Sequence, residues 1–154
     1  MSHRDCKQLR RQRGVATIEF AICAPLLIFL LLATAEIGRL LFQYNALAKS
    51  VRDGGRFVAS ASANTTQVPN ITNTVRTQTQ NLVVTGNSAG TGSAILPGFA
   101  TDDVNVQIVS NVFVSVSATY DYQPMLGASL PTFGLGDSIN LSIPLTATVV
   151  MRVL

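Results

Sequence analysis

The apolar positions of this chain form one long continuous run near the start and shorter alternating runs later. Residues 15–35 read VATIEFAICAPLLIFLLLATA and carry a single charge, Glu19. A helix rises about 1.5 Å per residue, so this run spans roughly 30 Å, the thickness of the hydrocarbon core of a bilayer. The run predicts a transmembrane segment. A carboxylate inside such a helix costs about 2.5–3.5 kcal/mol on insertion scales, so Glu19 needs an explanation.

The helical spacing of apolar residues continues beyond residue 35. Positions three and four residues apart remain apolar, namely Ile37, Leu40, Leu41, Tyr44, Leu47, Ala48 and Val51. We therefore expect one long helix that ends near Phe57. Its first half, residues 15–35, would lie in the membrane, and residues 36–58 would form an amphipathic extension outside it.

The remaining residues, 59–154, have the pattern of a small α+β domain. A short helix is expected at residues 70–83, with Asn70 as its N-terminal cap. Its apolar stripe is predicted to contain Ile71, Val75, Gln78 and Leu82. Residues 85–93 are rich in Gly and Ser and are expected to form a flexible loop.

Three strands are expected after this loop. Residues 104–109 and 112–120 alternate between apolar and polar side chains, and residues 139–154 are rich in β-branched residues. Ser110 and Asn111 would form a tight turn between the first two strands, and residues 123–138 would be a long connection. Pro144 favours an edge position or a bulge for the last strand. An antiparallel sheet packed on the outer half of the long helix would bury one core.

The charge distribution indicates a membrane orientation and gives no sign of a nucleic-acid partner. The chain has 154 residues, 47% of them apolar and only 12% charged, with a net charge of +3. Five basic residues and one acid precede Gly14, whereas six basic and seven acidic residues follow it. The positive charge therefore belongs to residues 1–14, a basic leader, and this bias places the amino terminus in the cytoplasm and the domain outside.

The sequence contains few candidates for catalysis, a cofactor or a metal. His3 is the only histidine, and the two cysteines, Cys6 and Cys23, lie in the leader and the apolar run. The outer domain therefore has no histidine or cysteine with which to build a catalytic triad or a metal site. We expect no enzyme activity and no cofactor.

Two remaining clusters are more readily explained by structure than by chemistry. Asp102 and Asp103 are adjacent, and adjacent residues in a strand point to opposite faces, so a turn before a strand is expected there. Tyr120 and Tyr122 could form an exposed aromatic patch with Phe133, but packing in the core at a strand end is the preferred interpretation.

The start of the chain resembles a known processing signal. A basic leader that ends in Gly14 and is followed by Val15-Ala16-Thr17-Ile18-Glu19-Phe20 is similar to the type III signals that prepilin peptidases cut in type IV pilins. Residues 14 to 56 resemble the TadE-like pseudopilins of the tight-adherence (Flp, type IVc) pilus system. This similarity includes Pro25, Glu36-Ile37-Gly38-Arg39 and Arg52-Asp53-Gly54-Gly55-Arg56.

The resemblance implies cleavage between Gly14 and Val15. Glu19 would then be the fifth residue of the mature chain, where pilins characteristically carry glutamate, and Phe20 would follow it in the assembly segment. Cleavage creates a cationic amine on Val15, about one helical turn from Glu19. Glu19 would pair with this amine in its own or a neighbouring subunit; alternatively, it extends only to the membrane interface.

The resemblance also implies a function, partners and a location. The chain would be a minor pseudopilin in the inner membrane that acts in the assembly or initiation of an adhesive pilus involved in biofilm formation. Its partners would be a prepilin peptidase, other pseudopilins, the major pilin and the pilus assembly platform. Two alternatives remain: an uncut, single-pass envelope scaffold, or a secreted domain released after Ala35 by a signal peptidase that recognises Ala33-Thr34-Ala35.

Overall fold

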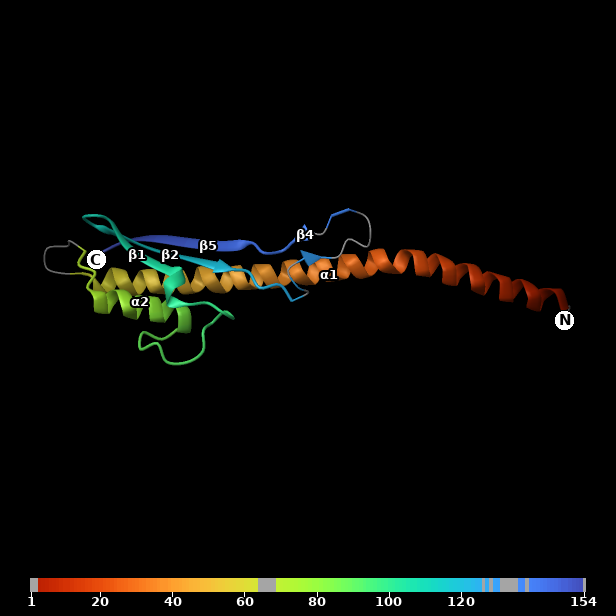
Figure 1. The fold of residues 1–154 in the computed structure, drawn as a ribbon, viewed down its shortest axis with the longest axis horizontal. Helices are drawn as coiled ribbons and strands as arrows, with labels where there is room; N and C mark the ends of the chain where they lie inside the picture. The colour runs from red at the N-terminus through yellow and green to blue at the C-terminus, as the bar shows by residue number, and fades with distance from the viewer. Residues whose placement is uncertain are drawn as a thin grey trace.

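One long helix organises the whole structure. The computed structural model describes residues 3–63, 69–125, 127, 129–130, 136–137 and 139–153, with side chains from Gly14 onward except at 129–130 and 139–140. Helix α1 (His3–Ala61) has 59 residues and continues through Pro25. Its N-terminal half stands free, whereas its C-terminal half carries the rest of the protein (Figure 1). The α+β fold class predicted from the sequence is confirmed.

The second helix, α2 (Asn73–Thr85), begins three residues later than predicted. Thr72 is its cap, because the Thr72 hydroxyl accepts a hydrogen bond from Val75 N at 3.3 Å. The predicted cap, Asn70, instead donates its backbone N–H to Ser62 O at 3.2 Å, in the chain that approaches the helix. The predicted stripe was also partly wrong. The fully buried positions are Thr79, Val83 and Val84.

The main sheet is antiparallel, with strand order β1-β2-β5. Its strands are β1 (Val104–Ser110), β2 (Phe113–Asp121) and β5 (Pro144–Arg152). Ser110 pairs with Phe113 after an irregularity at the end of β1, so the tight turn contains Asn111 and Val112. The predicted turn was therefore displaced by one residue.

The segment predicted as one last strand is divided in two. Residues 139–140 form the short strand β4 (Ile139–Asn140), which pairs with β3 (Ser129–Leu130) in a separate ribbon. Strand β3 lies within the stretch that was expected to be a plain connection. Strand β5 then begins at Pro144, and it is an edge strand of the main sheet, as the proline predicted.

The core lies between the helices and one face of the sheet. Figure 1 shows the sheet along one side of the C-terminal half of α1 and α2 along another side. The inward positions of β2 are the alternating Val114, Val116, Ala118 and Tyr120, all at most 2% exposed. Val112, the first residue of the predicted alternation, lies in the turn instead.

Two glycines allow α1 to approach its neighbours closely. A Cβ added to Gly54 would overlap Val83 Cγ2 of α2, and one added to Gly55 would lie 2.6 Å from Val149 Cγ1 of β5. Side chains at these positions would push α1 away from α2 and from the sheet. The Gly-Gly pair therefore allows close packing on both sides of the helix.

Candidate assembly site

The four predicted site residues all lie on the free half of α1. Gly14, Val15, Glu19 and Phe20 are exposed, with 54% of the Val15 side chain and 67% of the Phe20 side chain accessible. A Cβ added to Gly14 would meet no atom within 4 Å. The fold therefore brings none of these residues into the domain and leaves the segment available to other molecules.

Helix geometry places the Glu19 side chain near the backbone of Val15. Side chains of an α-helix tilt toward its N-terminus, and residues four apart lie on one face. Both residues belong to the regular part of α1. An amine created on Val15 would therefore lie on the side of the helix toward which Glu19 points.

The free half of α1 exposes a large apolar surface. Residues from Gly14 onward form a helix long and apolar enough to cross a membrane, and the most apolar stretch is not buried by the fold. The most exposed side chains, each more than 60% accessible, are Ile18, Phe20, Ile22 and Leu31. Exposed apolar area of this extent indicates contact with lipid or with other helices.

This apolar surface continues beyond residue 35, past the predicted span. Ile37, Leu41 and Phe42 are 60%, 53% and 71% exposed. Ile37 and Leu41 were predicted to lie on the stripe that faces the core, together with Tyr44. That part of the prediction was wrong, whereas Leu40, Leu47, Ala48 and Val51 of the same stripe do pack in the core. Glu36 and Gln43, which the predicted stripe did not include, are also buried. The exposed positions are therefore free to pack against a neighbouring helix.

A buried carboxylate joins the helix to the domain where the predicted span ends. Glu36 is only 4% exposed, and its Oε1 accepts hydrogen bonds from Tyr122 OH at 2.5 Å and from Met125 N at 3.1 Å. Burial, followed by the hydrogen bond to Glu36 and its charge, raises the pKa of Tyr122 to about 12. We call Glu36, Tyr122 and Met125 the Glu36 clasp. It fixes the chain after β2 onto α1.

Sequence reasoning missed this clasp. Tyr122 was considered only as part of an aromatic patch, and Glu36 only as part of the family-like Glu36-Ile37-Gly38-Arg39. The available signal was a single acid directly after an apolar run, at a position where helical periodicity turns toward the domain. Tyr120 and Tyr122 are both 2% exposed, so packing in the core is confirmed for them, whereas Phe133 lies outside the described residues.

Two more polar groups lie next to the clasp on α1. Arg39 Nε and Gln43 Oε1 are buried and have no hydrogen-bond partner in the described part of the chain. Tyr120 OH donates to Pro97 O at 3.0 Å. Burial raises the pKa of Tyr120, and the nearby Arg39 charge opposes this shift. The first two turns outside the predicted span therefore present a polar row to the domain and an apolar face to the outside.

The other candidate groups do not form a chemical site. Asp102 and Asp103 lie in a short 3-10 helix, η1 (Thr101–Asp103), and Asp103 Oδ2 accepts from Ala100 N at 2.9 Å, which makes it a local cap. Among the described residues, no three His, Cys, Asp or Glu side chains gather as metal ligands do. Cys23 is exposed on the free half of α1.

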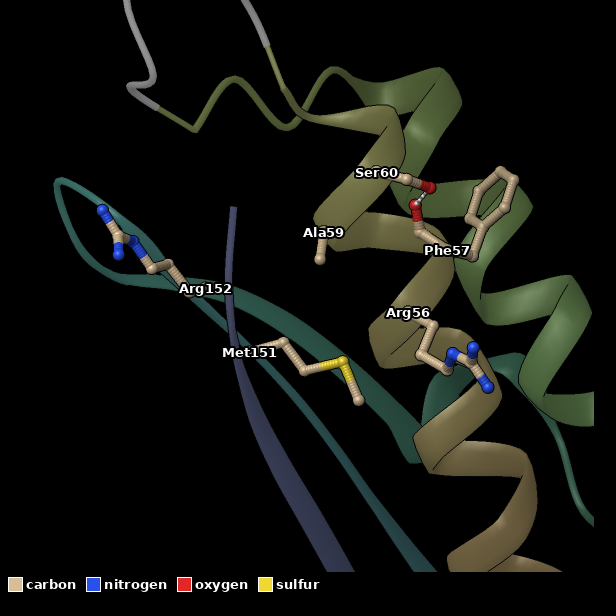
Figure 2. Close-up of a pocket in the computed structure, with 6 residues that line it drawn as sticks. All are labelled: Arg56, Phe57, Ala59, Ser60, Met151 and Arg152. Atoms are coloured by element: carbon tan, nitrogen blue, oxygen red, sulfur yellow. Dashed lines mark hydrogen bonds between the residues drawn. The ribbon is translucent and has the colours of Figure 1, made fainter. Parts of the chain in front are cut away.

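A hollow of about 620 Å³ lies between the end of α1 and the end of β5. Figure 2 shows the Met151 side chain extending from β5 toward α1, while the guanidinium groups of Arg56 and Arg152 point away from each other. An anion site needs cations that converge on one point. The hollow therefore lacks the geometry of a site for an anionic ligand.

The comparisons with known proteins concern the segment that contains the predicted site. Residues 14–56 match the family model of TadE-like proteins. This match confirms the resemblance found in the sequence, and it runs from the predicted cleavage junction to Arg56. No curated protein and no solved structure matches the chain significantly. Helix α2 and the sheet lie outside the matched segment.

Proposed function

We propose that this chain, whose residues 14–56 match the TadE-like family model, is a minor pseudopilin of the tight-adherence pilus system. A prepilin peptidase would cut it after Gly14, and it would then act in the assembly or initiation of a Flp-type pilus used for adhesion and biofilm formation. The observation that carries the proposal is the free half of α1, which is exposed and apolar from Val15 to beyond residue 35. Such a helix has few uses in an isolated protein and suits insertion into a bundle of similar helices.

The cleavage junction has properties that suit a peptidase. Gly14 and Val15 are exposed, and Gly14 has no side chain to block a narrow subsite beside the scissile bond. The junction also lies at the border between the basic leader and the apolar run, where a membrane-bound protease can reach it from the cytoplasmic side.

Glu19 would contribute after cleavage. A lone carboxylate in the hydrocarbon region is costly, but one paired with an amine costs far less. The new amine on Val15 is cationic at neutral pH and lies one helical turn away. Pairing with the amine of a neighbouring subunit would favour helices that enter the bundle in the correct register, with Phe20 packing beside the pair.

The proposed location is the inner membrane, with the leader in the cytoplasm and the domain in the periplasm. The positive leader supports this orientation. The Glu36 clasp would then lie at the periplasmic surface of the membrane and hold the domain against the emerging helix. The proposed partners are the prepilin peptidase, the other pseudopilins, the major pilin and the assembly platform.

The substitution Gly14→Leu tests the proposal at its first step. The larger side chain would block the subsite, so the full-length precursor should accumulate in the membrane of cells that carry the pilus system. Gly38→Leu is the matched control, since an added Cβ at Gly38 also meets no atom within 4 Å and the residue lies far from the junction. Normal-sized mature protein from Gly14→Leu would contradict cleavage by a prepilin peptidase after Gly14 and would favour cleavage elsewhere, such as release after Ala35.

A further inference from the structure

The two edges of the main sheet are treated differently by the fold. Along the free edge of β1, Arg76 Nη1 donates to Val106 O at 2.7 Å and Gln80 Nε2 donates to Val104 O at 3.0 Å. Both side chains come from α2, which therefore occupies the carbonyl groups that a further strand would use. Native proteins commonly block sheet edges in this way to prevent unwanted pairing.

The free edge of β5 has no such cover among the described residues. Val153 N donates to Val112 O and Tyr122 N donates to Ile143 O. In the same register, the backbone groups of the odd-numbered residues of β5 form the hydrogen bonds to β2. In an antiparallel ladder, the backbone N–H and C=O groups of the residues between them point away from the partner strand. The N–H groups that face outward therefore belong to Thr146, Thr148, Val150 and Arg152. Pro144 is the outward position that lacks an N–H group, and it costs no ladder hydrogen bond there.

Between Pro144 and Arg152, the outward positions of β5 also lack the usual devices that prevent strand addition. From Thr146 to Val150 the edge carries no charge and no proline, and its pairing with β2 continues without a bulge. A groove of about 200 Å³ runs beside this edge, between β5 and the face of α1 that contains Tyr44, Ala48 and Arg52. A strand added to β5 would direct alternate side chains into this groove, as in other cases of strand addition.

Geometry argues against a second copy of this chain as the added strand. Figure 1 shows that β5 and α1 run in the same direction, away from the free half of the helix. Antiparallel pairing of two β5 strands would therefore direct the two membrane segments to opposite sides. Parallel pairing would place the two α1 helices on opposite faces of one sheet and separate their exposed apolar faces. The remaining edge of a copy, β1, is blocked by α2.

We propose that the free edge of β5 is a docking site for an extended segment of a different subunit of the pilus assembly. The segment would add to the sheet through backbone hydrogen bonds to Thr146, Thr148 and Val150. Its side chains that face the groove would be small and polar, with one carboxylate directed at Arg52, the charged residue that lines the groove. This inference rests on the proposed function, because it assigns the partner to the same assembly.

Residue-resolved hydrogen exchange on the full-length protein tests this site. In the purified protein in detergent, the amides of Thr146, Thr148 and Val150 should exchange rapidly, while those of Ala147 and Val149 are protected by β2. In assemblies isolated from piliated cells, the three outward amides should slow by about tenfold or more. Unchanged exchange in the assembled protein would overturn the docking site and leave the proposed function intact. Absence of the protein from assemblies and from the platform would overturn both.

The occupant is identified with a photoreactive residue in place of Thr148. The expected product links this position to a strand-like segment of another pilus subunit, and a link to a second copy of this chain would contradict the proposal. Arg52→Glu should reduce this cross-link about tenfold, because it opposes the expected carboxylate. Lys49→Glu is the matched control, since Lys49 is an exposed cation on the same helix outside the groove, and it should leave the cross-link unchanged.

Discussion

The substitution Tyr122→Phe tests the Glu36 clasp with the smallest possible change. It removes one oxygen and leaves the aromatic ring in the core. The Glu36 carboxylate, only 4% exposed, would then keep Met125 N as its one hydrogen-bond donor from outside α1 in the described part of the chain. A hydrogen bond to a charged group contributes about 1.5–3 kcal/mol, and a buried acceptor left partly unsatisfied costs a similar amount. We therefore expect a loss of roughly 2 kcal/mol in the free energy of unfolding of the domain.

The chain provides matched controls for this substitution. Tyr120→Phe removes a neutral hydrogen bond to Pro97 O, worth about 1 kcal/mol. Tyr44 is 42% exposed on α1, so Tyr44→Phe should change stability by less than about 0.5 kcal/mol. Thermal unfolding in detergent, followed by circular dichroism, should show midpoints falling by roughly 8–16 °C for Tyr122→Phe, about half as much for Tyr120→Phe and hardly at all for Tyr44→Phe. Equal midpoints for Tyr122→Phe and Tyr44→Phe would refute the clasp as a stabilising contact.

Three other predictions concern α1 and its contacts. Because the pKa of Tyr122 is raised to about 12 from 10, its contribution to the free energy of unfolding is complete below pH 10 and is lost between pH 10 and 12. A denaturant titration should therefore show that alkaline pH lowers the free energy of unfolding less in Tyr122→Phe than in wild type, and an equal loss would contradict this. Gly54→Ala should destabilise the domain by about 1–3 kcal/mol through overlap with Val83, whereas Gly38→Ala, with no atom nearby, should be neutral or stabilising in the same unfolding assay. The Glu19→Gln variant should be inserted and cut normally, but it should cross-link poorly to other pilus components and give few pili, because breaking a buried pair costs on the order of 3–5 kcal/mol. Unchanged piliation would mean that Glu19 has no role in assembly.

Local patterns predicted much of the fold. The alternation at residues 112–120 correctly predicted β2 and the inward positions Val114, Val116 and Ala118, because period-two patterning follows directly from which face is buried. Pro144 correctly predicted an edge, because a proline cannot donate to an internal ladder. The long helix also followed from its period, although α1 extends from His3 to Ala61, beyond both predicted ends.

The errors came from features that depend on tertiary contacts. The stripe on residues 37–51 was assigned by hydrophobicity alone, which correctly placed Leu40, Leu47, Ala48 and Val51 against the core but wrongly included Ile37 and Leu41 and missed the buried Glu36 and Gln43. The burial of Glu36 is possible because Tyr122 and Met125, which lie 86 and 89 residues away, supply hydrogen-bond donors to it. Ile37 and Leu41 remain exposed, because their partners lie outside this chain in the proposed function. A single sequence cannot show either fact.

The sequence predicted where the candidate assembly site lies, but the roles of its residues remain predictions. The family match begins at Gly14 and supports the segment that contains the junction and Glu19. The roles of Gly14, Val15, Glu19 and Phe20 stay predictions, since they require a peptidase, a membrane or a neighbouring helix. Pro144 predicted that β5 is an edge strand, but the sequence could not show that α2 covers the edge of β1 and leaves the edge of β5 open, because this contrast depends on tertiary contacts.

The amino-terminal residue of the protein extracted from membranes of piliated cells tests the central claim most directly. We expect Val15, because cleavage after Gly14 would create the amine that is proposed to pair with Glu19. Met1 or Ser2 would show an uncut anchor and contradict the pseudopilin assignment. Glu36 would show release after Ala35, which would separate the domain from the exposed helix on which the whole proposal depends.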